Sequence, residues 1–198
     1  MTEERQIRIG PQFYVLFAMF TLLLFPVHEF GHYITYRLLG VHLQMTLNTA
    51  SPDDKSLRRP VAELAGPIVN LVIALGATFA FQKLGQTKSW LAALGLASAM
   101  FRLAVYFLVL CVALFTGSGL SMGNDEPIAA RLWGFPSLTF VGVFAIPFLL
   151  VVWCIARTFR ANRFQTLLHI LGLGFSTLCL GILVGHYIDP WLFPGRYQ

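Results

Sequence analysis

The chain has 198 residues, of which 57% are hydrophobic and 12% are charged, whereas a typical soluble domain is about 25% charged. Too few charged residues remain to cover a soluble domain of this size, so the composition excludes most soluble folds and indicates a bilayer protein. Fourteen Lys and Arg residues against nine acids give a net charge of +5. These charges form short clusters between apolar stretches, which argues against nucleic acid as a partner and favours contact with anionic lipid headgroups.

Five apolar segments follow one another along the chain, each about 20 residues or longer, the length that crosses a bilayer as a helix. We therefore predict an all-α polytopic (multi-pass) integral membrane protein whose residues 1–198 form a single membrane-embedded domain. The first three spans are expected over residues 12–39, 61–82 and 90–116, and two additional spans over residues 136–157 and 164–188. The basic residues divide almost evenly between the two sides, so they do not decide the orientation.

A short stretch between the first two spans has a different pattern. From Val41 to Asn48, apolar and polar residues alternate at every position, which is the period of a β-strand. A strand at membrane depth must be buried in protein, line a wet cavity or lie at the interface, because lipid cannot pair its backbone. We expect either a short membrane-associated β segment here or an interfacial loop that happens to alternate.

The first span contains the motif His-Glu-x-x-His at His28, Glu29 and His32. On a helix, residues four positions apart share a face, so the two imidazoles can bind one zinc ion. Glu29 projects beside that face, where a carboxylate can act as a general base without being a ligand. Ionisable residues inside a span are costly and are functional candidates by default. The motif therefore predicts a site for one Zn²⁺ ion.

A catalytic zinc site requires a third protein ligand from elsewhere in the chain. Asp125 stands out because it follows a Gly-rich, non-helical stretch directly after the third span, and the adjacent Glu126 is its main rival. Asp125 could instead be a solvated loop acid or the cap of a short helix that begins near it. The other acids and histidines that could reach membrane depth are Glu63, His42, His169 and His186.

Three further features concern packing and buried polar groups. Gly66 near the start of the second span permits close approach of another helix, and Asn70 would face the bundle, where it could bond a neighbouring backbone or a substrate carbonyl. Arg102 lies in the middle of the third span, where a cation requires a partner such as Glu63, a substrate carbonyl or a lipid phosphate. The small residues Gly181 and Gly185 allow the last span to pack closely within the chain or in a homodimer.

The metal motif in one span and Ala-Gly-Pro-Ile-Val-Asn, residues 65–70, opening the next resemble the site-2 protease family of intramembrane zinc metalloproteases. The resemblance covers about the first 125 residues and three core spans. It implies that His28, His32 and Asp125 bind zinc and that Glu29 is the catalytic base. It also implies a substrate-receiving role for the alternating segment. The family's Asn-x-x-Pro-x-x-x-Asp-Gly pattern is absent here, and Gly-Asn-Asp-Glu-Pro, residues 123–127, stands in its place.

The leading hypothesis is a zinc endopeptidase that hydrolyses a peptide bond in or near the transmembrane segment of another membrane protein. In that mechanism Glu29 transfers protons and Asn70 steadies the oxyanion. The altered segment around Asp125 motivates an alternative, a metal-binding pseudoprotease that holds or regulates membrane proteins without cleavage. A third hypothesis is a small ion transporter that uses His28, Glu29, Arg102 and Asp125 as its path.

Overall fold

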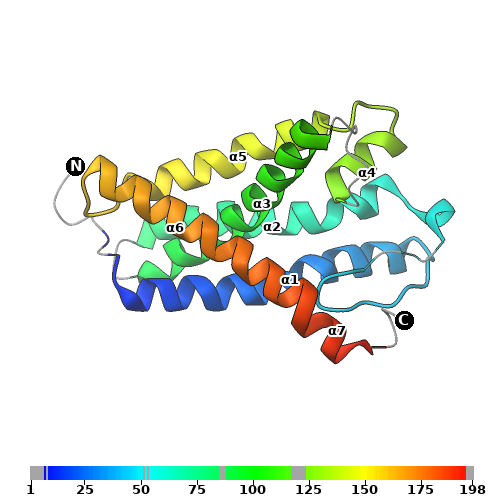
Figure 1. The fold of residues 1–198 in the computed structure, drawn as a ribbon, viewed down its shortest axis with the longest axis horizontal. Coiled ribbons are helices and arrows are strands. Elements are labelled where there is room, and N and C mark those ends of the chain that lie inside the picture. Colours follow the sequence, from blue (N-terminus) through cyan, green and yellow to red (C-terminus); the bar gives the residue numbers. More distant parts are fainter. Residues whose placement is uncertain are drawn as a thin grey trace.

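The protein forms helices and no β-strand in the part of the chain that the computed structural model describes (Figure 1). The described residues are 7, 9–50, 52, 54–84, 88–116 and 124–194. Five helices are long and apolar enough to cross a membrane, which confirms the predicted all-α polytopic class. They are α1 (Pro11–Leu38), α2 (Pro60–Leu84), α3 (Ser89–Thr116), α5 (Thr139–Ala156) and α6 (Arg163–Ile182).

Shorter helical elements complete the described chain. The 3-10 helix η2 (Lys55–Leu57) precedes α2, and α4 (Asp125–Leu132) lies between α3 and α5. The last span does not end with α6, because a π-helical turn, η4 (Leu183–Ile188), and α7 (Asp189–Leu192) continue it. The predicted bounds of the first three spans agree with the helices to within two residues, while α5 begins three residues later than expected.

Helices α1, α2 and α3 pack on one another and form the centre of the molecule, while α5 lies against α2 and α3. Helix α6 crosses α1 and α3 diagonally, from the end near the N-terminus towards the opposite end (Figure 1). Alanines that are fully buried let α3 approach its neighbours closely, as small residues do between membrane helices. These alanines are Ala92, Ala93, Ala97 and Ala99.

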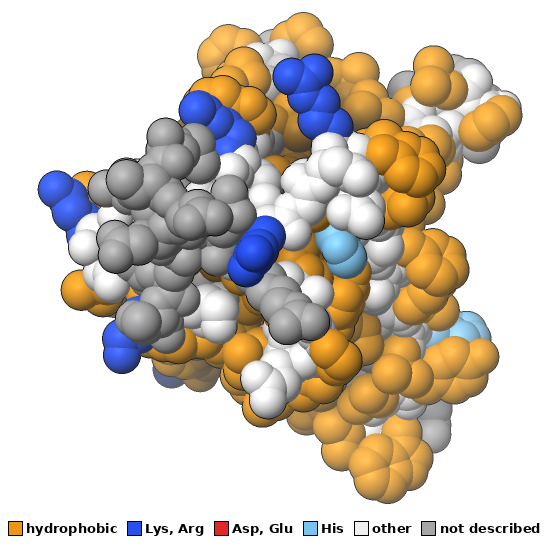
Figure 2. Space-filling model, turned by 90° about the vertical axis from the view of Figure 1, so that its left-hand side faces the viewer, with side chains coloured by type: hydrophobic (Ala, Val, Ile, Leu, Met, Phe, Trp, Pro, Cys, Tyr) orange, Lys and Arg blue, Asp and Glu red, His pale blue; other side chains and the backbone are white. Residues whose placement is uncertain are grey.

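The two ends of the bundle differ in charge. The last turn of α2, the start of α3, and the connection from α5 to α6 lie at the end near the N-terminus. The basic residues of these segments are Lys83, Lys88, Arg157, Arg160 and Arg163. Figure 2 shows Lys and Arg side chains on this end and, among its described residues, no acidic side chain. Cations flanking an apolar band are typical of segments that contact lipid headgroups. The opposite end contains α4 and the segment that follows α1.

The expected β segment is not formed. Residues Val41–Asn48 have no strand pairing, and their polar groups are bonded in other ways. The Thr46 amide donates to the Thr49 carbonyl (2.9 Å) in a turn, and the Leu47 amide donates to Asp189 Oδ1 (2.8 Å). Period-2 alternation alone is insufficient for a strand, because a strand also needs a neighbour that offers a continuous row of backbone partners.

Candidate metal centre

Two glycines bring α1 and α2 into close contact at the motif. A Cβ on Gly31 would lie 3.1 Å from the backbone oxygen of Ala65, and a Cβ on Gly66 would lie 2.6 Å from His28 Cε1 and closer still to His32 Nε2. These distances are shorter than ordinary van der Waals contacts, so only glycine fits at either position without a shift. The predicted close approach at Gly66 is confirmed, and the neighbouring group is the imidazole pair itself.

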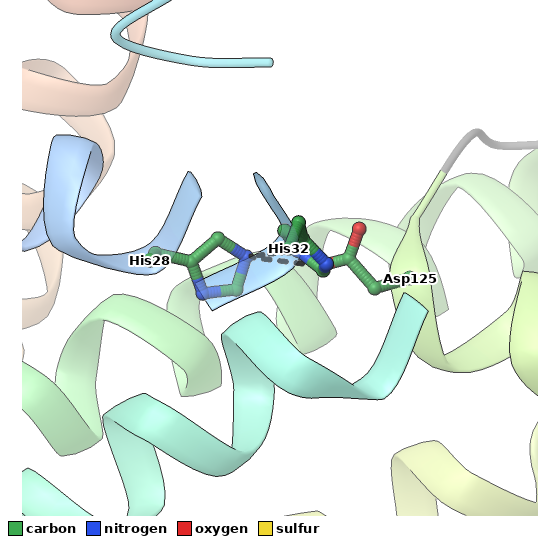
Figure 3. Close-up of side chains that lie close together, drawn as sticks. All are labelled: His28, His32 and Asp125. Atoms are coloured by element: carbon green, nitrogen blue, oxygen red, sulfur yellow. Dashed lines mark hydrogen bonds and ion pairs between the residues drawn. The ribbon is translucent and has the colours of Figure 1, made fainter. Parts of the chain in front are cut away.

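Three potential ligand atoms, on His28, His32 and Asp125, converge beside Gly66, and Figure 3 shows their three side chains. His28 Nε2 lies 3.2 Å from His32 Nε2 and 3.0 Å from Asp125 Oδ2, and His32 Nε2 lies 3.5 Å from the same carboxylate oxygen. The histidines share one face of α1, as their spacing predicts, and Asp125 comes from the first turn of α4. These three residues form a group that could hold a metal ion.

The tautomer of His32 suits metal binding. Its Nδ1–H donates a hydrogen bond of 2.7 Å to the Ala62 carbonyl, so in the neutral ring the lone pair is on Nε2, the atom that faces His28 and Asp125. Metal-ligating histidines commonly donate their second ring nitrogen to such an outer acceptor. His28 Nδ1 is buried and has no hydrogen-bond partner among the described residues.

The surroundings of Asp125 favour the ionised form of its carboxyl group. Burial raises the pKa of the Asp125 carboxyl, but the neighbouring His32, His28 and Arg102 outweigh burial and hold this pKa well below its ordinary value. An ionised carboxylate and two imidazoles are a donor set that divalent metal ions accept, and zinc in particular. The residues present therefore fit a metal ion, on the evidence of the donor set and of the space at Gly66 that a Cβ would fill.

Glu126 does not join the ligand group; it pairs with Arg102. The guanidinium Nη2 donates to Glu126 Oε2, and the Tyr106 hydroxyl donates to Glu126 Oε1. Glu63, which was a candidate partner for Arg102, instead accepts from the Tyr36 hydroxyl and lies 3.9 Å from the Arg58 guanidinium. Arg102 Nη1 also lies 3.3 Å from Asp125 Oδ2, so the cation is a direct neighbour of the candidate metal ligands.

A cavity of about 830 Å³ lies beside the ligand group. Its wall includes His28, His32, Asp125 and Glu29. Glu29 makes no hydrogen bond or ion pair with any described residue, so its carboxylate is available to a ligand in the cavity.

Asn70 lies one helical turn beyond Gly66 but does not line the cavity. It is fully buried, and neither side-chain amide atom has a partner within the described chain. The structure therefore brings four of the five predicted site residues to the cavity wall, and Asn70 is not among them.

The remaining candidate histidines are distributed around the fold. His42 accepts from Arg37, and His169 is hydrogen-bonded to the Tyr14 hydroxyl across α1 and α6. His186 lines the cavity and is exposed. None of the three belongs to the metal-ligand group found among the described residues.

Sequence reasoning missed two contributions to the site. Tyr106 lies four residues after Arg102 on the same face of α3, a spacing that could have indicated a shared partner. Gly181 and Gly185 also line the cavity, where a Cβ on Gly181 would meet Phe25 and a Cβ on Gly185 would meet Asn48. The small-residue pair therefore lies against other parts of the same chain, while the homodimer stays a prediction.

Comparisons of the chain with models of known protein families, with curated proteins and with solved structures found no match. Fold and site together define a class of protein: a polytopic helical membrane protein in which two buried histidines and a partly buried aspartate form a group that could hold a metal ion beside a cavity.

Proposed function

We propose that the chain is a zinc-dependent intramembrane endopeptidase of the site-2 protease type, which hydrolyses a peptide bond in or near the transmembrane segment of another membrane protein. The observation that carries this proposal is the convergence of His28, His32 and Asp125 on the wall of a cavity that Glu29 also lines. Two imidazoles and one carboxylate leave a fourth zinc position open, as catalytic sites require.

His28 Nε2, His32 Nε2 and a carboxylate oxygen of Asp125 would hold the zinc ion. When bound, zinc polarises a carbonyl group and lowers the pKa of water. A carboxylate oxygen of Glu29 takes a proton from the attacking water and passes it to the leaving amine nitrogen as the peptide C–N bond breaks and the new C–O bond forms. The cavity admits water to a site within the length of a spanning helix.

A helical substrate hides its carbonyls in hydrogen bonds and must unwind before hydrolysis. The segment from Val41 to Asn48 is not paired as a strand, and its end at Asn48, with Thr49 and Ala50, lines the cavity. An extended substrate could pair with free backbone groups of this segment. Asn70 would act on the substrate only after a movement that brings its amide to the cavity.

The test is the variant Glu29→Gln, because an amide is isosteric with the carboxylate but cannot accept the proton. New N-termini would be labelled and identified in membranes that contain the parent chain or the variant. We expect cleavage sites in transmembrane segments with the parent, their loss in Glu29→Gln, and an unchanged zinc content. Glu63→Gln is the matched control, since Glu63 also lines the cavity but is no metal ligand, and the amide oxygen that the substitution introduces still accepts from Tyr36. Equal sets of termini with parent and Glu29→Gln would contradict the mechanism.

A second candidate is a metal-binding pseudoprotease that holds membrane helices without cutting them. The observation that favours it is the Arg102 guanidinium, which lies 3.3 Å from both His28 Nε2 and Asp125 Oδ2. A guanidinium this close to two ligand atoms can obstruct the open zinc position that water and a substrate carbonyl need, while the three ligands still hold the metal. Stoichiometric zinc that is lost in His32→Ala, with no parent-dependent cleavage of any membrane protein, would support this candidate over the protease.

A further inference from the structure

We propose that Arg102, Tyr106 and Glu126 form a clasp between α3 and α4 that positions Asp125 as the third metal ligand. This inference rests on the metal centre of the proposed function but not on proteolysis. It assigns a role to a buried ion pair that the hydrolytic mechanism does not use.

The clasp occupies both oxygens of the Glu126 carboxylate. Arg102 Nη2 donates to one oxygen and the Tyr106 hydroxyl donates to the other. Arg102 and Tyr106 are four residues apart on α3, so both project from one face of a long, rigid helix. Two donors from one face fix the orientation of the carboxylate as well as its position.

Asp125 is the residue next to Glu126 and is tied to the same guanidinium. Arg102 Nη1 lies 3.3 Å from Asp125 Oδ2, the oxygen that faces both histidines. Arg102 thus contacts both carboxylates of the Asp-Glu pair through its two terminal nitrogens. The planar fork of an arginine suits this double contact, which a lysine cannot reproduce.

Helix α4 depends on such ties for its placement. It has eight residues, and isolated helices shorter than about 12 residues are marginal in water. Its N-cap residue, Asn124, makes no side-chain capping bond. Apolar contacts of Ile128, Ala129 and Ala130 bury α4, but such contacts are non-directional. The directional bonds of the clasp therefore determine where the first turn points Asp125.

The clasp also balances charge at the metal centre. Arg102 and Glu126 are both buried, with side-chain exposures of 4% and 0%. A buried charge without a partner is strongly destabilising. Glu126 cancels the charge of Arg102, so a metal ion bound by His28, His32 and Asp125 experiences a neutral pair and not an isolated cation. This explains why a glutamate follows Asp125 at the point where the site-2 protease pattern has a glycine.

The test measures metal binding directly, using Co²⁺ and Zn²⁺ with the full chain in detergent micelles. Co²⁺ gives visible bands that report ligand identity and geometry, and competition with Zn²⁺ gives its affinity. The variants are Arg102→Met, Glu126→Gln, Tyr106→Phe and the double variant Arg102→Met/Glu126→Gln. We expect each single variant to weaken metal binding by about tenfold or more, as loss of outer-shell partners does, and to shift the Co²⁺ bands.

The double variant separates positioning from a purely structural role. Arg102→Met leaves the buried Glu126 without a cation, and Glu126→Gln leaves Arg102 with Asp125 as its one remaining carboxylate partner. Both lower the thermal stability of the metal-free protein, whereas removing both charges restores it. We expect the double variant to recover stability while its Co²⁺ bands and affinity stay altered. Ser98→Ala is the matched control, because Ser98 lies one turn earlier on α3 and donates to the Asn70 carbonyl (2.7 Å). It should lower stability without changing the bands.

Two results would overturn the proposal, and they are distinguishable. If the double variant binds Co²⁺ with the parent's affinity and bands, the clasp does not position Asp125, although the metal centre stands. If the parent itself binds neither metal, the centre and the proposed function fail together, and the clasp loses its role with them.

Discussion

The inner helices and the outer helices of this bundle are built on different principles. In α2 and α3, 50% and 44% of an apolar 18-residue stretch is buried, against 22% in α5 and 17% in the span that contains α6. Together with α1, these inner helices carry His28, His32 and Arg102, and α4 adds Asp125, while α6 exposes large apolar side chains such as Phe175. Buried polar groups require fixed partners, so the inner helices pack tightly; lipid can cover an apolar face without them.

The largest expected effect is a loss of metal affinity in Gly66→Ala, because this substitution disturbs the close contact between α2 and the two histidines of α1. The added Cβ would overlap His32 Nε2 and lie 2.6 Å from His28 Cε1, so the imidazoles must move away from Asp125. We expect metal affinity to fall by about 100-fold, the upper end for disturbed ligand orientation. Zn²⁺ titration in detergent measures this affinity.

The matched control is Gly76→Ala on the same helix, where a Cβ meets nothing within 4 Å. Equal metal affinities for the two variants would show that the space at Gly66 is not needed for metal binding.

Phe17→Ala and Phe175→Ala test the difference in packing between the inner helix α1 and the outer helix α6. Phe17 on α1 is 1% exposed and Phe175 on α6 is 69% exposed. Truncating the buried ring leaves a cavity that costs about 3 kcal/mol, whereas lipid replaces the exposed ring at a cost within about 0.5 kcal/mol. Equilibrium unfolding in mixed micelles measures both free energies. Losses of the same size would show that the outer face is packed as tightly as the inner one.

A smaller effect is expected where the end of the last span is hydrogen-bonded to the segment that follows α1. Asp189 in α7 accepts from Thr46 Oγ1 and from the Leu47 amide, each at 2.8 Å. Asp189→Ala should speed hydrogen exchange at the Leu47 amide by about tenfold, the worth of one hydrogen bond to a charged group. Hydrogen–deuterium exchange followed by mass spectrometry measures this rate. The metal affinity should stay unchanged. Thr46→Val removes the hydrogen bonds of the Thr46 hydroxyl but keeps the Asp189 carboxylate, so it should leave the Leu47 amide protected. Rapid exchange at that amide would refute the assignment.

The spans were predictable because length and apolarity decide them, and both are local properties of the sequence. The pairing of His28 with His32 was predictable for the same reason, since one turn of helix fixes it. Asp125 lies 97 residues after His28, so the sequence indicated it as one of several candidates, and only tertiary packing brings it to the histidines.

Other features depended on partners that no local pattern specifies. The alternation from Val41 left a strand and an interfacial loop open, and the backbone amides of Thr46 and Leu47 bond to Thr49 and to Asp189, which is far away in the chain. The cost of a lone cation correctly indicated that Arg102 needs a partner, yet not that Glu126 supplies it. Buried polar groups constrain the number of bonds that must form, while the fold selects which groups form them.

The position of the motif along α1 has a consequence for sidedness. His32 lies six residues before the end of α1 at Leu38, or about 9 Å at 1.5 Å per residue, whereas Pro11 at the other end is about 32 Å away. In sealed proteoliposomes, a chelator that cannot cross lipid should extract bound metal when added to the compartment that faces α4, and should be inert in the other. Access of such a chelator would thus reveal which leaflet each end of the bundle occupies.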